Sequence, residues 1–370
     1  MDAKLTRIDI SGFKSFESSN DFKPKGINVL IGPNGAGKSN FISFFRLLTH
    51  MFSSDGQLQT YVSTNCGGAS ALLYDGPEVT PHMDGHLCLE TSLGNNEYQF
   101  RLSYSAGDCF VFTKEQFRYS SFDFTRPAKW KVMDVGHKES KLLSPKISKD
   151  KTAKTIVGLL KQIVVYQFHN TSFTSRFRRK WRIDDRRWLK EDGGNLGVFL
   201  YGLKEEMPEY YRRVIMIIRA VMPFFDDFYL IPERDTLLLA WKEQGSDIVF
   251  NASQASDGML RFISLVSLLG QPVGNLPAVL MLDEPELGLH PYALEVVSGL
   301  IKSVGQERQV FIATQSPRFV DCFEPEDIVI IDRNGRSSTM NRLDPEDLKD
   351  WLDTYSLSEA WEKNVLGGTP

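Results

Sequence analysis

Residues 32–39, with the sequence GPNGAGKS, constrain the fold and chemistry of this chain more than any other segment. They match the pattern GxxxxGK[ST] at every fixed position and lie between a predicted strand at 27–31 and a predicted helix at 40–50. Glycines let consecutive backbone N–H groups turn inward around a phosphate, and the N-terminus of the following helix adds positive potential. Lys38 is predicted to reach the β- and γ-phosphates of ATP, and the Ser39 hydroxyl to bind Mg²⁺. The other predicted nucleotide contacts are Asn34, Gly35, Ala36, Gly37 and Asn40.

A second motif, at residues 279–285, is an apolar run followed by two acidic residues and a proline. The run predicts a buried strand, which places Asp283 and Glu284 at the carboxyl edge of a parallel sheet, beside the phosphate loop. Asp283 can hold Mg²⁺ through water, and Glu284 can polarise the water that attacks the γ-phosphate. An acidic pair at a strand end is common by itself. Together with the phosphate loop it predicts an ATP-hydrolysing enzyme.

The remaining patterns predict an α/β fold. Three strand-like runs within 86–117 predict an antiparallel meander, and 208–221 has the apolar spacing of a helix. Residues 126–154 are rich in lysine, serine and proline, so we predict a mobile insertion there. We expect four segments along the chain: an ATPase lobe with the meander at 1–120, an insertion and helical lobe at 121–260, core strands at 261–335, and an acidic helical tail at 336–370.

The ordered set of motifs resembles the ABC-type ATPase heads of SMC, RecF and OLD-like proteins. Residues 10–16 (ISGFKSF) are similar to the start of these heads, and 283–291 (DEPELGLHP) to their second acidic motif. Residues 256–258 (SDG) look like a variant of the ABC signature, and 313–317 (ATQSP) occupy the place of the switch segment. The resemblance implies a two-lobed head, in which a mixed sheet with the phosphate loop and an antiparallel layer are joined to a helical second lobe.

The resemblance also implies that two heads close around nucleotide, as a homodimer or a higher homo-oligomer. In such heads the signature helix of one copy completes the site of the other, so Ser256 and the backbone of Gly258 would touch the γ-phosphate across the interface. Considered alone, Ser256 is better explained as an ordinary helix cap. The signature here carries Asp257 where transporters have glycine.

Two glutamines complete the predicted site. Gln315 stands at the switch position, where transporters usually have histidine, and we assign it a catalytic role with Lys38 and Glu284. A glutamine can hydrogen-bond phosphate or water but carries no proton or charge, which suggests slow turnover. Gln167 follows a strand-like run at 163–166 and is a candidate Q-loop residue that senses Mg²⁺. The alternative is an unremarkable surface glutamine at a strand end.

A basic stretch is the next most informative feature, with seven basic residues among the twelve from 176 to 187. Basic residues interleaved with aromatic ones suit phosphate contacts and base stacking. The alternative is a solvated or interface loop, in which Arg178 or Arg187 pairs with nearby acids such as Asp184 or with acids of a partner. The candidates for nucleic-acid or partner contacts are Arg176, Arg178, Arg179, Lys180, Trp181 and Arg182.

The composition and the absent segments narrow the function further. No apolar run approaches the roughly 20 residues of a membrane span, and the first residues lack a signal peptide, so we expect a cytoplasmic protein with no membrane contact. After the switch segment only 53 residues remain (318–370), too few for the nuclease domain that some OLD-like proteins carry. Any work driven by ATP would therefore pass to a separate effector protein or to DNA held between heads.

Three functions remain open. The first is an ATP-gated switch subunit of a bacterial anti-phage defence complex, which controls a separate nuclease or toxin. The second is a RecF-like ATPase of DNA repair or chromosome maintenance that binds duplex DNA. The third is a scaffold that ATP holds together without hydrolysis, for which Gln315 is the one supporting feature.

Overall fold

Apolar runs far apart in the sequence become the parallel strands of one buried central sheet. The computed structural model describes residues 4–53, 57–123, 128–346, 351 and 354–368. The strand order is β17-β16-β3-β15-β14-β8, and all neighbours are parallel except β17 and β16. The strands are β3 (Ile27–Ile31), β8 (Ile163–Tyr166), β14 (Val279–Asp283), β15 (Gln309–Ala313), β16 (Ile328–Asn334) and β17 (Ser337–Arg342). The edge strand β17 lies within residues 336–370, the segment predicted as an acidic helical tail, in which the sequence also indicates a strand at 338–342.

The central sheet separates two hydrophobic cores, because side chains alternate between its faces. One face packs against the helices of the second lobe, and the other against the layer that contains the antiparallel sheet. The first face carries Val29, Ile31, Leu280, Leu282, Val310 and Ile312. The second face carries Leu30, Val279, Met281, Phe311 and Ala313. A sheet covered on both sides explains why its strands read as continuous apolar runs.

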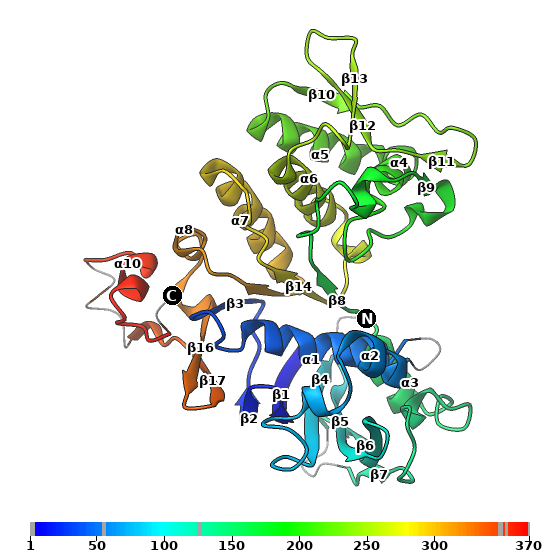
Figure 1. The fold of residues 1–370 in the computed structure, drawn as a ribbon, viewed down its shortest axis with the longest axis vertical. Coiled ribbons are helices and arrows are strands. Elements are labelled where there is room, and N and C mark those ends of the chain that lie inside the picture. The colour runs from blue at the N-terminus through cyan, green and yellow to red at the C-terminus, as the bar shows by residue number, and fades with distance from the viewer. Residues whose placement is uncertain (1–3, 54–56, 124–127, 347–350, 352–353, 369–370) are drawn as a thin grey trace.

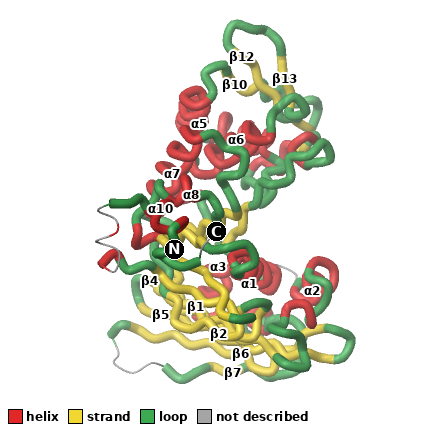
Figure 2. Tube along the Cα trace, turned by 60° about the vertical axis from the view of Figure 1, so that its left-hand side comes forward, coloured by secondary structure: helices red, strands yellow, loops and turns green. Residues whose placement is uncertain are grey.

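Helix α1 (Lys38–Met51) lies between the central sheet and the antiparallel sheet (Figure 1). Its Phe41 and Phe45 rings pack against Phe311 of β15, and Phe44 packs against Phe13 and Phe100 of the antiparallel sheet. That sheet has the order β2-β1-β4-β5-β6-β7 and forms the lower layer in Figure 2. Its strands are β1 (Lys4–Phe13), β2 (Phe16–Phe22), β4 (His82–Thr91), β5 (Gly94–Ser105), β6 (Cys109–Ser121) and β7 (Lys131–Val132). The meander, the mixed sheet and the two-lobed α/β fold are thus as predicted.

Residues 128–160 belong to this lower layer, which differs from the predicted boundary at residue 121. Strand β7 pairs with β6, and α3 (Lys151–Leu160) buries its apolar face in the same core. The buried Glu115 carboxylate holds the connection, because it accepts hydrogen bonds from Ser140 Oγ (2.5 Å), Tyr98 Oη (2.7 Å) and the Lys141 backbone (3.0 Å). The predicted mobile insertion is therefore wrong for residues 128–154, and residues 126 and 127 lie outside the described part.

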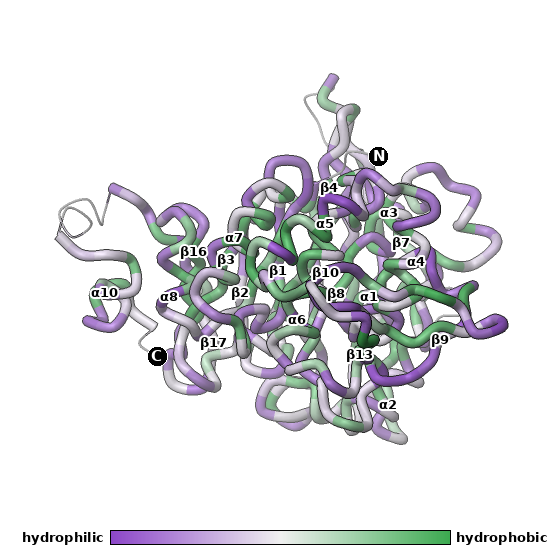
Figure 3. The backbone as a smooth tube through the Cα atoms, turned by 90° about the horizontal axis from the view of Figure 1, so that it is seen from above, coloured by the Kyte–Doolittle hydropathy of each residue, from purple (hydrophilic) through white to green (hydrophobic). Residues whose placement is uncertain are grey.

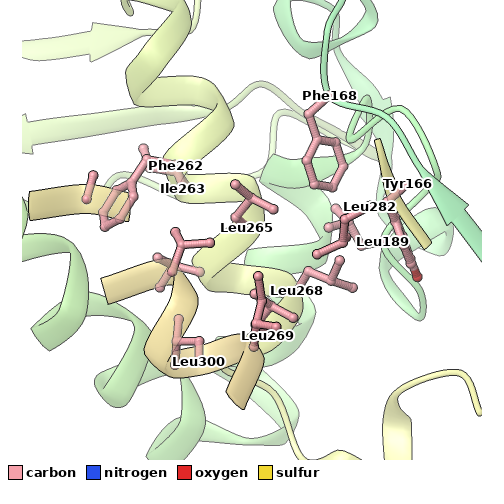
Figure 4. Close-up of a cluster of buried hydrophobic side chains, with 14 of the residues drawn as sticks. Tyr166, Phe168, Leu189, Phe262, Ile263, Leu265, Leu268, Leu269, Leu282 and Leu300 are labelled. Carbon is pink, nitrogen blue, oxygen red and sulfur yellow. The ribbon is translucent and has the colours of Figure 1, made fainter. Parts of the chain in front are cut away.

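The second lobe follows β8 and contains four helices and small antiparallel sheets. Helix α5 starts at a proline in its first turn, and α6 is capped by Ser256, as the sequence predicts. The helices are α4 (Leu196–Glu206), α5 (Pro208–Val221), α6 (Asp257–Leu269) and α7 (Pro291–Gly305). The strands are β9 (Trp181–Arg182), β10 (Phe225–Phe228), β11 (Thr236–Leu237), β12 (Ala240–Glu243) and β13 (Val249–Asn251). Figure 4 shows how Leu265 and Leu268 of α6 pack towards Phe168 and Leu282 near the end of the central sheet.

The C-terminal residues lie at one edge of the molecule (Figure 3). Helix α10 (Leu357–Glu362) packs against α8 (Pro317–Val320), and the fully buried Trp361 donates a 2.5 Å hydrogen bond to the Gly368 carbonyl. A side chain built on Gly368 would lie 3.5 Å from Cα of Gly32, so the tail reaches the phosphate loop. The shorter helices are α2 (Leu58–Asn65), η1 (Ser70–Leu72), η2 (Lys141–Leu143), η3 (Arg176–Arg178), η4 (Ile183–Arg186), η5 (Val273–Asn275) and η6 (Pro325–Asp327). No helix within the described ranges has the length and apolar character to cross a bilayer.

Candidate nucleotide site

The phosphate loop joins β3 to α1 and leaves the N-terminus of α1 open. Gly37 precedes the helix with φ of 124°, and no side chain caps the first turn. The first backbone bond of the helix runs from Phe41 N–H to the Gly37 carbonyl, so the preceding amides face the loop. A 14-residue helix with uncapped amides is a ready site for an anion. Asn34, Gly35 and Ala36 lie in the loop, and Ser39 and Asn40 in the first helical turn.

Strand β17 supports this loop from a position about 300 residues away in the sequence. Ser338 Oγ donates a short hydrogen bond to the Ala36 carbonyl and lies 2.7 Å from Ser15 Oγ, which accepts from Asn40 Nδ2 at 2.8 Å. A Cβ atom on Gly37 would lie only 2.4 Å from Ser338 Oγ. The fit requires glycine at this position, both for the positive φ and for the close approach. No local pattern pointed to Ser338.

Lys38 is buried at the base of the loop. Its Nζ donates hydrogen bonds to the carbonyls of Gly32 (2.5 Å) and Pro33 (3.1 Å). Burial lowers the pKa of Lys38, while the charges of Glu284 and other acids nearby act in the opposite direction. The ammonium group is thus close enough to the acidic motif to be influenced by it, although the two come from opposite ends of the chain.

Asp283 ends strand β14 and is buried, with 9% of its surface exposed. Burial raises the pKa of Asp283 above its ordinary value, against the opposing charges of Arg46 and Lys38. Gln167, the predicted Q-loop residue, donates a hydrogen bond of 3.1 Å from Nε2 to Asp283 Oδ2. The structure therefore brings Gln167 and Asp283 together through the Gln167 amide nitrogen, while the Gln167 oxygen accepts from Arg46.

Glu284 and Gln315 meet at the same edge of the sheet. Glu284 has a positive φ of 43°, and its N–H donates to the Ala313 carbonyl at 2.8 Å. Gln315 Nε2 donates to Glu284 Oε1 at 2.6 Å. Glu286 holds this switch segment, because its Oε1 accepts from Thr314 Oγ1 (2.6 Å) and from the Gln315 N–H (3.1 Å). The catalytic pair inferred from the sequence is thus adjacent in space.

Arg46 and His169 also belong to the site, and sequence reasoning missed both. Arg46 donates to Gln167 Oε1 at 2.6 Å and lies 4.0 Å from Asp283 Oδ2. His169 Nε2 lies 2.9 Å from the Asp283 carbonyl oxygen and 3.8 Å from Glu284 Oε2. No sequence motif distinguishes an arginine on an amphipathic helix, or a histidine shortly after a strand, from other residues of the same type. Their one signal was proximity in sequence to the phosphate loop and to Gln167.

The signature segment lies at the start of α6 in the second lobe. Ser256 Oγ accepts a 3.2 Å hydrogen bond from the Met259 N–H, which is the helix-cap arrangement that the sequence left as the alternative. A Cβ atom on Gly258 would lie 2.3 Å from the Gly288 carbonyl, so the close packing of α6 on the acidic-motif loop requires glycine here. Within the described residues, no hydrogen bond joins Ser256 or Gly258 to the phosphate loop of the same chain.

The residues of this site fit ATP and Mg²⁺. The open N-terminus of α1 and the Lys38 ammonium offer donors and positive charge to phosphates. The hydroxyl of Ser39 and the carboxylate of Asp283 are the hard oxygen donors that Mg²⁺ prefers, whereas the side-chain oxygen of Gln167 is bonded to Arg46 and would have to turn to reach the metal. No cluster of three or more histidine, cysteine or acidic side chains suited to a metal occurs in the described part of the chain.

The basic stretch is largely neutralised by its own surroundings. Arg178 is buried, donates to the carbonyls of Thr171 and Ala252, and lies 3.7 Å from Asp257. The other ion pairs of the stretch join Arg176 to Asp192, Lys180 to Glu233, Arg182 to Asp184 and Asp235, and Arg186 to Glu206.

Trp181 donates from Nε1 to the Arg176 carbonyl, and the Arg176 guanidinium lies over its ring. Arg179 is exposed and donates to the Thr174 carbonyl at 3.3 Å. In the structure these basic residues are paired within the chain, and contact with nucleic acid or a partner stays a prediction. Arg178 in particular is a structural link to the signature segment, because its side chain is too buried to reach a phosphate backbone.

Comparisons with known proteins agree with this geometry. Residues 27–321 match the model of a family described as "AAA domain, putative AbiEii toxin, Type IV TA system". Among solved structures, an Smc head bound to the C-terminal winged-helix domain of ScpA is similar, with 14% identity, a TM-score of 0.58, and coverage of 94% of this chain and 99% of that one.

A second Smc head, with an extended coiled coil and bound to the C-terminal domain of ScpA from Pyrococcus furiosus, gives 15% identity, a TM-score of 0.57, and coverage of 95% and 99%. No curated protein gives a significant match. At this level of identity the likeness to the Smc heads establishes the fold, which is that of an ABC-type, SMC-like ATPase head.

Proposed function

Since the chain belongs to the AAA-domain family whose description names the putative AbiEii toxin, we propose that it binds ATP with Mg²⁺ and hydrolyses it to ADP and phosphate. The observation that carries the proposal is the meeting of Lys38, Asp283 and Glu284 at one sheet edge, from positions about 245 residues apart in the sequence. Such convergence of a phosphate-binding lysine with an acidic pair has no evident structural purpose, since burial of these charges is unfavourable.

Each residue has a chemical task in this proposal. The amides of the α1 N-terminus and Lys38 bind and orient the β- and γ-phosphates. Ser39, Asp283 and Gln167 would hold Mg²⁺, which neutralises charge on the phosphates when bound. Glu284 orients the attacking water and accepts its proton, while Gln315 keeps the Glu284 carboxylate in place.

We further propose that two copies close head to head around ATP. In support, Asp257 of the signature is exposed, with 59% of its side chain accessible, and large apolar side chains are exposed beside it. Phe173 is 87% exposed and packs under the Arg178 guanidinium that contacts Asp257, and Leu287 of the acidic-motif loop is 38% exposed. Exposed apolar residues around a polar centre are typical of protein interfaces. The second copy would bring Ser256 and Gly258 to the phosphates of the first.

For the biological role we propose a nucleotide-gated switch that controls a separate effector, such as the nuclease or toxin of an anti-phage defence complex in the cytoplasm. The toxin–antitoxin wording of the family description supports this proposal, and the winged-helix domain bound to a similar Smc head shows that such a fold can carry a partner protein. Binding of duplex DNA has less support, because most of the basic stretch is paired internally.

The test is steady-state ATP turnover over a range of protein concentrations, with and without duplex DNA. We expect turnover to rise more than linearly with concentration, to be indifferent to DNA, and to fall at least ~100-fold in Glu284→Gln while ATP affinity is kept. Glu307→Gln, an exposed carboxylate outside the site, is the matched control and should behave as wild type.

Equal turnover in wild type and Glu284→Gln would sink the enzyme proposal and favour a scaffold held together by ATP. Stimulation by DNA would instead favour a repair ATPase. Turnover strictly proportional to protein concentration would contradict the paired heads.

A further inference from the structure

We propose that His169 is a positioning residue, which fixes the peptide unit between Asp283 and Glu284 and thereby aims the Glu284 carboxylate. This inference rests on the proposed hydrolysis, in which Glu284 orients the attacking water. It stands on three features of the structure. The first is a chain of hydrogen bonds that runs in one direction, and the second is a peptide unit that is hydrogen-bonded at both ends. The third is the strained backbone of Glu284, which the bonds to that peptide unit maintain.

The chain of hydrogen bonds starts at Arg46. A guanidinium can only donate, so the 2.6 Å contact from Arg46 identifies the Gln167 atom facing it as the oxygen. The amide nitrogen of Gln167 must then face the other way, where it lies 3.1 Å from Asp283 Oδ2 and 3.0 Å from His169 Nδ1. Its two hydrogens serve these two acceptors.

The same reasoning assigns the protons of His169. Because the Gln167 amide nitrogen donates, Nδ1 of His169 accepts. The Asp283 carbonyl oxygen can only accept, so the 2.9 Å contact requires a proton on His169 Nε2. The ring is therefore the neutral tautomer protonated at Nε2, and its proton is directed at the main chain of the acidic motif rather than at a side chain.

The peptide unit between Asp283 and Glu284 is bonded at both ends. His169 Nε2 donates to its carbonyl oxygen at 2.9 Å, and its N–H donates to the Ala313 carbonyl at 2.8 Å. Glu284 follows with φ of 43°, a left-handed conformation that costs energy for a residue with a side chain. Such a conformation persists only when its surroundings hold it. Loss of the His169 bond would free one end of the peptide unit and let the Glu284 side chain turn away from Gln315.

His169 is itself held firmly. Arg261 of α6 donates from Nη2 to the His169 carbonyl at 3.0 Å and from Nε to the Phe168 carbonyl at 3.2 Å. His169 borders a narrow pocket, whose lining includes the apolar side chains of Phe168, Leu265 and Leu282. The imidazole is thus fixed on a rigid support, as a positioning role requires.

Two substitutions separate the bonds that His169 makes. In His169→Gln the side-chain amide nitrogen can take the place of Nε2 and donate to the Asp283 carbonyl, whereas in His169→Asn an oxygen can take the place of Nδ1 and accept from Gln167. We expect His169→Gln to keep at least about half of the wild-type kcat, and His169→Asn to lose about 10- to 100-fold. The dissociation constant for ATP and the melting temperature should stay within error of wild type in both. His82→Gln, on the exposed face of the antiparallel sheet, is the control.

The outcomes decide the proposal in either direction. Equal kcat values in His169→Gln and His169→Asn would overturn it, whether both fall or both are unchanged. An equal loss of ATP affinity and kcat would also overturn it, since that pattern marks a binding residue.

A spectroscopic measurement covers the case in which the wild type shows no turnover and the proposed function itself fails. Nitrogen chemical shifts of labelled histidine at about pH 8, with His169 assigned by its absence in His169→Gln, report which ring nitrogen carries the proton. Protonation at Nε2 supports the proposal, and protonation at Nδ1 overturns it.

Discussion

The side-chain amide of Gln315 donates a hydrogen bond of 2.6 Å to the carboxylate of Glu284. The donor is held in place from behind, because Glu286 accepts from the backbone N–H of Gln315 and from the neighbouring Thr314 hydroxyl. Gln315 thus fixes the orientation of the Glu284 carboxylate, as a charged switch residue could also do. Unlike a histidine, its amide cannot transfer a proton. The switch segment and the acidic motif form one unit at the sheet edge.

This unit gives the first prediction. Gln315→Ala should lower kcat for ATP about 10-fold, because Glu284 loses its orienting donor, and should leave ATP affinity nearly unchanged. Gln315→Glu should lower kcat further, since it places a second carboxylate next to Glu284. Both are checked by steady-state kinetics together with direct nucleotide binding. A kcat of Gln315→Ala equal to wild type would show that the hydrogen bond has no role in turnover.

A second prediction concerns Asp283, whose burial raises its pKa above the ordinary 3.8. The Asp283 carboxyl group therefore keeps its proton to higher pH in the folded protein than in the unfolded chain. The contribution of Asp283 to the free energy of unfolding accordingly falls as the pH rises from 3.8 through the folded-state pKa. At pH 7 the full cost of the buried charge is present. Asp283→Asn should accordingly raise the melting temperature at pH 7 without Mg²⁺, yet abolish Mg²⁺-dependent turnover.

The stabilisation by Asp283→Asn should shrink as the pH is lowered and disappear below the ordinary carboxylate pKa, where wild type is also uncharged. Thermal melts between about pH 3 and 8 measure this directly. A variant that is less stable than wild type across the whole range would contradict the prediction.

The third prediction concerns Arg178, which we expect to contribute to stability. Its side chain is 9% exposed and donates to the carbonyls of Thr171 and Ala252. Removing a charged donor leaves these buried acceptors without partners, so Arg178→Ala should lower the free energy of unfolding by about 2–3 kcal/mol. Arg179→Ala, an exposed neighbour, is the control and should change it by less than about 0.5 kcal/mol. Urea denaturation of both variants is the measurement; similar values for the two would be evidence against the assignment.

A fourth prediction tests the docking of the C-terminal residues. Trp361 is fully buried between α10 and α8, and Trp361→Ala should lower the free energy of unfolding by about 3–5 kcal/mol. Trp361→Phe keeps most of the volume and loses mainly the hydrogen bond to the Gly368 carbonyl, so about 1 kcal/mol is expected. Trp351→Ala removes a partly exposed indole and serves as the control. If Trp361→Ala proves no more harmful than Trp351→Ala, the tail contributes little to the fold.

The sequence by itself determined the parts of the protein that depend on consecutive residues. The phosphate loop, the acidic motif and the strands at 27–31, 163–166 and 279–283 lie where the apolar runs and glycines predicted them. These features are local: a buried strand needs a continuous apolar run, and a phosphate loop needs glycines at set positions before a helix. The resemblance carried by the motifs was enough for the two-lobed fold of an ATPase head.

Tertiary structure alone decided which side chains meet at the site. Ser338 supports the phosphate loop from 302 residues away, and His169 and Arg46 reach the acidic motif although no spacing rule connects them. The same holds for residues 128–154, whose composition suggested a mobile insertion, whereas in the structure the buried Glu115 bonds Ser140 and Lys141 to the antiparallel sheet. Composition reports how polar a segment is. The residues that a segment contacts are set by the packing of elements that are distant in sequence. That packing also pairs several basic residues of 176–187 with acidic residues.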